Sequence, residues 1–203
     1  MNIICFGDSI TSAKDFAEGD RWPTILQFKL NAWRPDTYKV YNRGIGGNTT
    51  AQGLERMEED VLPYLPGLLL VQFGFNDSNI RPWSQVSRVG VEDYQKNLRE
   101  FQRIAAAHQS RCVFIINHII ARYGDSHRMP NGATYNTNFA PYDQAIRQVG
   151  QDLSAAAIDL PRLMQEQNVS VDSLVSDDGL HLSIAGNHHY AELVFMALKT
   201  SIL

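Results

Sequence analysis

Five short runs of apolar residues divide the chain, and each has the length of a β-strand. They are Ile3–Phe6, Tyr38–Tyr41, Leu68–Phe73, Val113–Asn117 and Ala155–Leu160. The runs are nearly continuous rather than alternating with polar positions, which is typical of parallel strands that helices cover on both faces. The pattern therefore predicts a five-stranded parallel sheet inside the protein.

Between these runs, apolar residues recur at helical spacing. The clearest example is Val91–Ala107, where apolar positions share one face and charged positions the other. A second helix is predicted from about Phe139, with Pro141 in its first turn, where a missing N–H costs little. Further helices are predicted over Trp22–Trp33, Thr50–Tyr64 and Ser183–Leu198. This alternation predicts a three-layer α/β/α sandwich in a single domain spanning residues 1–203.

Composition narrows the class of protein further. Hydrophobic residues make up 44% of the 203 residues and charged residues 20%, which is ordinary for a soluble globular protein. The formal net charge of -4 argues against a nucleic-acid partner, which favours a basic face. No apolar stretch is long enough to cross a bilayer, and no secretory signal precedes the first strand. We expect a cytoplasmic protein, or a processed secreted form that has been given a new Met1.

Neither cysteine indicates a redox or metal role. Cys5 and Cys112 lie in or beside apolar runs and are expected in the core as small hydrophobic residues. Two cysteines are too few for a cysteine-rich zinc site, and the histidines show no convincing ligand spacing. We expect neither a metal nor a cofactor.

Two long polar connections leave the carboxyl ends of predicted strands. They are Asp77–Gly90 and Ala121–Thr137. Ligands of open α/β sheets bind beyond these strand ends, so both connections are candidates for substrate contacts. The alternative is that they are ordinary surface loops.

A serine near the start of the chain and a histidine near its end carry the candidate chemistry. Ser9 stands in Gly7-Asp8-Ser9, directly after the first strand, and His181 ends Asp178-Gly179-Leu180-His181. A serine hydroxyl is a weak nucleophile until a base takes its proton, and that base works best when a carboxylate fixes its tautomer. Asp178 stands three residues before His181, a spacing that lets it reach the imidazole. Asp8 is expected to hold the turn through backbone hydrogen bonds.

Two further motifs offer hydrogen-bond donors. The segment Asn42–Thr49 is rich in glycine, but Thr49 occupies the third glycine position of a dinucleotide-binding fingerprint. A turn that donates a backbone N–H to an oxyanion fits this segment better. Asn76, in Gly74-Phe75-Asn76-Asp77, carries an amide that could donate to the same oxyanion, or could simply satisfy a turn.

Taken together and in this order, the four motifs resemble the SGNH hydrolases, also called GDSL-type esterases and lipases. The resemblance extends over nearly the whole chain, from Phe6 to Leu182. It implies that Ser9 is the nucleophile, that His181 is the base and that Asp178 orients the base. It further implies an oxyanion hole made by the backbone N–H groups of Ser9 and Gly47 and by the side-chain amide of Asn76.

The resemblance also implies a fold. Members of the family have a flavodoxin-like five-stranded parallel sheet, with the nucleophile on the first strand-to-helix turn. No Gly-x-Ser-x-Gly nucleophile elbow of the α/β-hydrolases occurs in the chain. One departure from the family name is mild, because Ile10 stands where the motif has leucine.

The expected activity is hydrolysis of a carboxylic ester through an acyl-serine intermediate. Because the loops are polar and include Trp83, Tyr123 and Tyr135 as candidate substrate contacts, we expect short, acetyl-type esters of a polar or carbohydrate alcohol. The family also contains lysophospholipases and thioesterases that act on longer acyl chains, and an acyltransferase would use the same acyl-enzyme. A non-catalytic binding protein is the least favoured alternative, because the chain retains all of the residues that such a protein would be expected to lose, Ser9, Asn76, Asp178 and His181.

Overall fold

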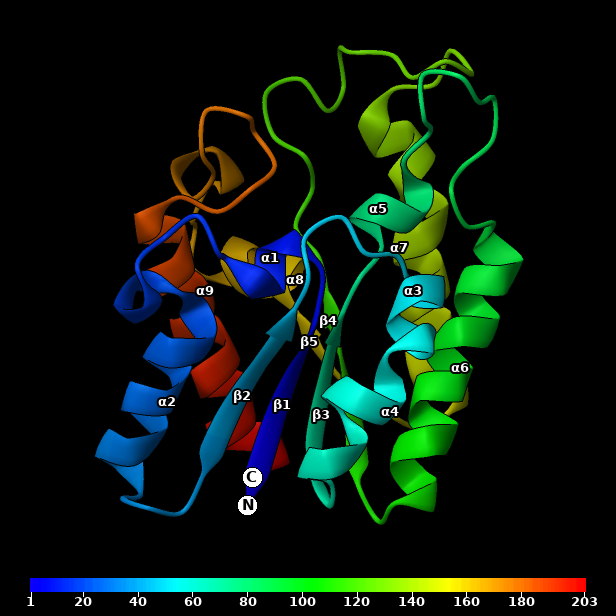
Figure 1. Cartoon of the computed structure of the whole chain (residues 1–203). Helices are drawn as coiled ribbons and strands as arrows, with labels where there is room; N and C mark the ends of the chain where they lie inside the picture. The colour runs from blue at the N-terminus through cyan, green and yellow to red at the C-terminus, as the bar shows by residue number, and fades with distance from the viewer.

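The computed structural model describes all residues, 1–203, and contains a five-stranded, entirely parallel sheet (Figure 1). The strand order is β2-β1-β3-β4-β5. The strands are β1 (Asn2–Gly7), β2 (Lys39–Gly44), β3 (Gly67–Gln72), β4 (Arg111–Ile116) and β5 (Ala156–Asp159). All five predicted strands are therefore confirmed, with ends that differ by one to three residues.

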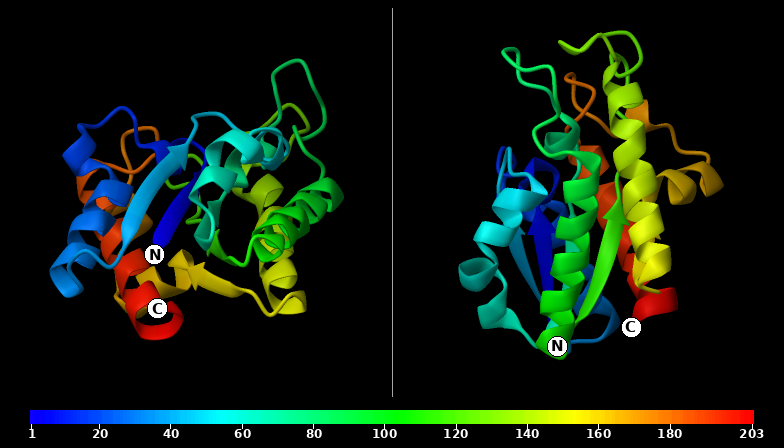
Figure 2. Two further views of the ribbon diagram at one scale, coloured as in Figure 1. Left: turned by 60° about the horizontal axis from the view of Figure 1, so that its bottom comes forward. Right: turned by 90° about the vertical axis from the view of Figure 1, so that its right-hand side faces the viewer.

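Helices cover both faces of the sheet, which confirms the predicted three-layer flavodoxin-like sandwich. On one face lie α2 (Trp22–Trp33), α8 (Leu160–Glu166) and α9 (Ile184–Ala197), and on the other α3 (Thr50–Glu55), α6 (Val91–Ala107) and α7 (Tyr135–Asp152) (Figures 1 and 2). Shorter elements are α1 (Ser9–Ser12), α4 (Met57–Asp60), α5 (Phe75–Ser78), η1 (Glu18–Asp20), η2 (Leu62–Tyr64), η3 (Val171–Ser173) and the terminal turn η4 (Leu198–Ile202).

Aromatic side chains fill the layer between the sheet and α6. The rings of Phe6 on β1, Phe73 just after β3 and Phe101 on α6 lie with their centroids 5.4–5.8 Å apart, and all three are fully buried. Such contacts stabilise a core beyond the area they bury. The apolar stripe predicted for this helix is therefore the face that meets the sheet.

The predicted helix Thr50–Tyr64 is wrong as a single element, because the segment forms α3, α4 and η2. Its start is well defined, because Thr49 and Gln52 form a reciprocal capping box. The first break follows at Arg56, whose guanidinium donates to the carbonyl of Gly7 at 3.0 Å. Pro63 then prevents a continuous helix because it has no N–H for the carbonyl four residues earlier.

The prediction that Pro141 lies in the first turn of its helix is also wrong. The helix α7 begins at Tyr135 rather than at about Phe139, because the Thr134 side chain accepts the backbone N–H of Thr137 and caps it there. Pro141 consequently lies inside the helix and leaves the Thr137 carbonyl without its usual donor. Both residues are exposed, so water can satisfy that carbonyl.

Both cysteines are buried and free, as expected. Burial raises the pKa of each thiol above its ordinary value, so neither is a reactive thiolate. No helix of the protein combines the length and apolar character needed to span a bilayer.

The order of the strands creates a crevice at the carboxyl ends of β1 and β3. Strand β1 pairs with β2 on one side and with β3 on the other, so the connections that follow β1 and β3 leave in opposite directions. Ligands of open α/β sheets bind at such a point. Gly7 ends β1 there, and a Cβ at this position would lie 2.5 Å from the Gln72 carbonyl oxygen, so only glycine fits.

Candidate active site

Ser9 is the first residue of α1, two positions after the end of β1. Asp8 caps this short helix, because its Oδ1 accepts the backbone N–H of Ile10 at 3.0 Å. The predicted role of Asp8 in holding the turn is thus confirmed. The Asp8 side chain is fully buried, and this burial raises its pKa to about 6, although the Ile10 hydrogen bond acts in the opposite direction.

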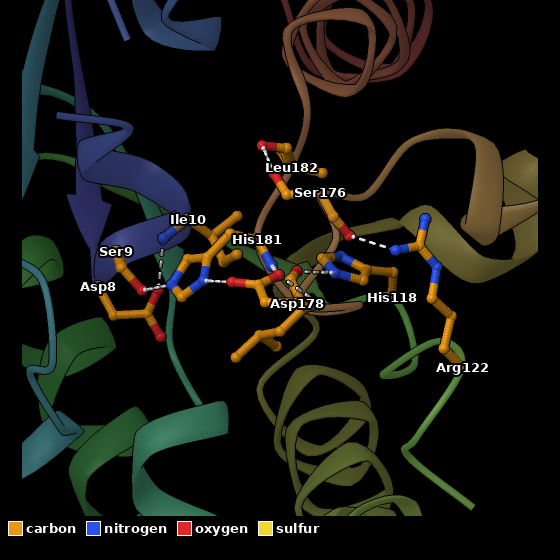
Figure 3. A network of polar contacts seen from close by, with 10 residues as sticks. Asp8, Ser9, Ile10, His118, Arg122, Ser176, Asp178, His181 and Leu182 are labelled. Carbon is orange, nitrogen blue, oxygen red and sulfur yellow. Dashed lines mark hydrogen bonds and ion pairs between the residues drawn. The ribbon is translucent and has the colours of Figure 1, made fainter. Parts of the chain in front are cut away.

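The fold brings Ser9 and His181 together across 172 positions of sequence (Figure 3). The Oγ of Ser9 lies 2.8 Å from Nε2 of His181, and Nδ1 of the same ring lies 2.6 Å from Oδ2 of Asp178. The carboxylate can only accept, so Nδ1 carries a proton and Nε2 of the neutral ring accepts from the hydroxyl. The three side chains form one continuous hydrogen-bonded series.

Asp178 is fixed by its own loop. Its Oδ1 accepts the backbone N–H groups of Leu180 and His181, both at 2.9 Å, which leaves Oδ2 for the imidazole. Partial burial raises the pKa of Asp178, but the hydrogen bonds from His181 and from the two backbone N–H groups outweigh it, and the net pKa lies below its usual value. The carboxylate therefore stays ionised at neutral pH.

A buried histidine holds the same loop through a hydrogen bond. His118 follows β4, and its Nε2 lies 2.9 Å from the Leu180 carbonyl oxygen (Figure 3). Because a carbonyl can only accept, Nε2 carries the proton. Complete burial lowers the pKa of His118 to about 4, so the ring is neutral at ordinary pH. Sequence analysis gave His118 no role, although its place directly after a strand was a usable signal.

Three candidate oxyanion donors belong to residues grouped around one cavity, Ser9, Gly47 and Asn76. The backbone N–H groups of Ser9 and Gly47 take part in no hydrogen bond within the chain. Gly47 has a φ of +78°, a conformation that favours glycine. Asn76 lies in α5, and its Nδ2 is 3.3 Å from Oδ2 of Asp8, which uses one of the two amide protons. The other N–H remains available to a ligand.

A cavity of about 230 Å³ opens beside Ser9 and His181. Besides the two catalytic candidates, its lining contains Gly47, Phe75, Asn76, Ser78, Asn79, Ile120, Tyr123, Met129, Tyr135 and Leu180. Two of the predicted substrate contacts, Tyr123 and Tyr135, therefore lie at the cavity. Trp83 does not line it, and 83% of its surface is exposed.

Sequence reasoning missed the apolar part of this lining. Phe75 belongs to the motif that was considered for its asparagine, Met129 lies in a connection that was considered polar, and Ile120 lies between a predicted strand and that connection. These positions gave only a weak signal, because an isolated apolar residue in a loop is also common on surfaces.

A larger hollow of about 460 Å³ lies elsewhere, at the edge of the sheet beside β5. Its lining includes Arg147 and Asp159, which form an ion pair with each other. It contains neither a histidine nor any of the motif residues. The smaller cavity at Ser9 is therefore the candidate active site.

The chain is similar to known proteins in sequence and in fold. The sequence matches the GDSL-like Lipase/Acylhydrolase family over residues 5–189. The chain is 30% identical over 201 residues to isoamyl acetate-hydrolyzing esterase 1 homolog of Rattus norvegicus, covering 91% of this chain and 76% of the relative. It is 24% identical to thioesterase 1/protease 1/lysophospholipase L1 of Escherichia coli K12, covering 88% and 74%.

A solved structure of similar fold is the lipase/acylhydrolase from Enterococcus faecalis. The two chains superpose with a TM-score of 0.78 at 26% identity, covering 98% of this chain and 95% of that one. The family match spans all four motifs, from the strand before Ser9 to the helix after His181. The chain therefore belongs to the GDSL-like Lipase/Acylhydrolase family and is an esterase of the SGNH type.

Proposed function

We propose that the protein hydrolyses carboxylic esters with Ser9 as nucleophile, His181 as general base and Asp178 as the group that orients the base. His181 takes the hydroxyl proton as Oγ attacks the ester carbonyl carbon. The imidazolium then gives this proton to the leaving alcohol, and an acyl-serine remains. Water releases the acid by the same route. The ionised state of Asp178 supports this proposal, because it stabilises the imidazolium that forms in each step.

In this mechanism, the oxyanion of each tetrahedral intermediate is stabilised by the N–H groups of Ser9 and Gly47 and by the amide of Asn76. The support is that both backbone N–H groups lack a partner within the chain and that Gly47 and Asn76 line the cavity at Ser9. Removing one such donor costs about 3–4 kcal/mol of transition-state stabilisation in other serine hydrolases.

The observation that carries the proposal is the 2.8 Å contact between Ser9 Oγ and His181 Nε2, continued at 2.6 Å to Asp178. A fluorophosphonate probe tests it directly, because the probe forms a stable bond only with an activated serine. We expect labelling of the wild type and none of Ser9→Ala, and a loss of roughly 10⁵- to 10⁶-fold in kcat for p-nitrophenyl acetate. Equal labelling of both proteins would overturn the proposal.

For the substrate, we propose short, acetyl-type esters of a polar or carbohydrate alcohol. The cavity of about 230 Å³ is smaller than the pockets of roughly 300–1,000 Å³ that hold drug-sized ligands. Its lining offers polar groups of Ser78 and Asn79 for the alcohol part. The name of the rat relative describes an acetate ester, which is consistent with a small acyl group.

Hydrolysis of longer acyl chains is the second candidate, as for the thioesterase and lysophospholipase named for the E. coli relative. The specific observation in its favour is the apolar part of the lining, Phe75, Ile120, Met129 and Leu180. A series of p-nitrophenyl esters from acetate to laurate separates the two. We expect kcat/KM to fall as the chain lengthens, and a preference for laurate would favour the second candidate. Product analysis with added sugars or alcohols would reveal acyl transfer.

A further inference from the structure

One arginine outside the four motifs contacts two of the proposed oxyanion donors, Gly47 in the turn after β2 and Asn76 in α5. Arg88 stands in the connection between α5 and α6. Its Nη1 donates to the backbone carbonyl of Gly47 at 2.8 Å and to Oδ1 of Asn76 at 3.3 Å. Its Nη2 donates to Oε1 of Gln52 at 3.1 Å. Arg88 is not among the residues that line the cavity.

The contact with Asn76 decides which end of the amide faces the cavity. An amide presents an acceptor oxygen on one side and a donor nitrogen on the other. Arg88 has only donors, so its guanidinium can bond Oδ1 but would repel Nδ2. On the other side, Asp8 has acceptor atoms and takes the amide N–H. The two neighbours therefore favour one orientation, in which the remaining N–H of Asn76 stays free.

The contact with Gly47 adds a charged hydrogen bond to a turn that is otherwise closed by the Asn48 N–H donating to the Ile45 carbonyl at 3.2 Å. Gly47 has no side chain, its φ is +78°, and nothing would lie within 4 Å of a Cβ at this position. Its carbonyl oxygen accepts from a charged donor, and such hydrogen bonds are stronger than those between neutral groups. Fixing this carbonyl restrains the adjoining residue, whose N–H is a proposed oxyanion donor.

Arg88 is itself held in place from both sides. Gln52, which accepts from Nη2, belongs to the capping box at the start of α3. The Arg88 backbone N–H donates to the Asn79 carbonyl at 2.9 Å, and the next residue, Val89, is buried and donates to the Asp77 carbonyl at 3.1 Å. The guanidinium is thus tied to the segments that carry Gly47 and Asn76.

We propose that Arg88 is a positioning residue that pre-organises two of the three oxyanion donors at once. This inference rests on the proposed function, because it concerns the same ester hydrolysis. A donor contributes to catalysis only when it already points at the place where charge develops. Without the guanidinium, the Asn76 amide can rotate and the Gly47 turn can move. The transition state loses stabilisation, while binding of the uncharged ester changes little.

The test compares Arg88→Ala with Arg81→Ala in the hydrolysis of p-nitrophenyl acetate. Arg81 is the matched control, because it is an exposed arginine in the same connection and its guanidinium has no hydrogen bond within the chain. We expect kcat of Arg88→Ala to fall about tenfold with KM within about twofold of the wild type, and Arg81→Ala to stay within about twofold in both. Wild-type kcat in Arg88→Ala would overturn the inference.

The double variant distinguishes positioning from a general structural effect. If Arg88 acts through Asn76 and Gly47, its loss should cost only about threefold in a protein that already carries Asn76→Ala. Independent, fully multiplicative losses would contradict that coupling. Arg88→Lys offers a second, charge-conserving variant. Its single ammonium lacks the planar fork, so we expect a loss of about fivefold in kcat with the thermal midpoint of the wild type.

Added guanidinium gives a readout that a loss of stability would not produce. At millimolar concentration it should raise the rate of Arg88→Ala several-fold, whereas sodium chloride at the same concentration should not. An equal response to both salts would contradict a specific guanidinium site. The outcomes also separate the two proposals, because an inactive wild type refutes the proposed ester hydrolysis, whereas an active wild type with an equally active Arg88→Ala refutes only the positioning role.

Discussion

At the residue scale, hydrogen bonds within the chain fix the orientation of the Asp178 side chain and of its loop. Asp178 uses Oδ1 for two backbone N–H groups and Oδ2 for the imidazole, so its carboxylate cannot rotate without losing three hydrogen bonds. His118 adds one hydrogen bond to this loop, from Nε2 to the Leu180 carbonyl, while its Nδ1 is buried without a partner. These contacts orient the loop and keep the His181 ring directed at Ser9.

The pH dependence of activity follows from this arrangement. The proposed base, His181, can accept the Ser9 proton only when its Nε2 carries none, while the lowered pKa of Asp178 favours the ionised carboxylate. We therefore expect kcat/KM to rise from acid to neutral pH, because a protonated Nε2 cannot accept from the Ser9 hydroxyl. Initial rates on p-nitrophenyl acetate, corrected for spontaneous hydrolysis, measure this. A flat profile over that range would count against His181 as the base.

At the element scale, a buried carboxylate joins α5, which carries Asn76, to the start of α3. Asp77 on α5 accepts both the backbone N–H of Thr50, at 2.9 Å, and the Thr50 hydroxyl at the start of α3. Its Oδ2 is buried without a partner. Burial raises the pKa of Asp77 to about 6, although the two Thr50 hydrogen bonds act in the opposite direction. These two hydrogen bonds position α3 against α5. Burying the ionised carboxylate costs free energy, so the stability they provide depends on pH.

Proton binding by Asp77 determines how the free energy of unfolding changes with pH. In the unfolded chain Asp77 titrates near its usual pKa of 3.8, so between that pH and about 6 the folded protein binds more protons. The free energy of unfolding therefore falls as pH rises through this window. We expect Asp77→Asn to gain up to about 3 kcal/mol of stability relative to the wild type between pH 4 and pH 7. Urea unfolding of both proteins across this range measures the difference, and a constant difference would contradict the raised pKa.

At the scale of the whole molecule, the crevice exists because β1 is flanked by β2 and β3 and because the backbones meet closely at its end. The segments after β1, β2 and β3 contribute Ser9, Gly47 and Asn76, and the loop before α9 contributes Asp178 and His181. Gly7 stands where these segments converge, with the Gln72 backbone and the Thr11 side chain around it.

A methyl group at Gly7 should disturb both stability and activity. A Cβ there would lie 2.2 Å from Thr11 Oγ1 and 2.5 Å from the Gln72 carbonyl oxygen, and backbone cannot move aside cheaply. We expect Gly7→Ala to lose roughly 2–3 kcal/mol in free energy of unfolding and to lower kcat by displacing Ser9. Gly19→Ala is the matched control, since no atom lies within 4 Å of its Cβ. Equal stability of the two variants would show that the strands can separate to accept the methyl group.

Some features of the fold and of the candidate site could be predicted from the sequence, and others could not. The strands could be predicted because parallel strands buried on both faces are continuous apolar runs. The helix Val91–Ala107 could be predicted because its apolar stripe is long. Pro63 was a visible signal against one continuous helix over Thr50–Tyr64, whereas the break at Arg56 was hidden, because that residue contacts the distant Gly7 carbonyl on β1. The contacts of Arg88 and His118 were hidden too, since each is with a backbone carbonyl that is distant in sequence.

The sequence by itself determined the order of strands and helices, the family and the chemical groups of the site, because local periodicity and short motifs encode these. Only the tertiary structure decided which atoms meet. It brought Ser9 within 2.8 Å of His181 across 172 positions, set Trp83 outside the cavity and connected Gly47 to Asn76 through Arg88. The physical reason is that a hydrogen bond requires atoms within about 3 Å, and distances between remote segments follow from packing of the whole chain.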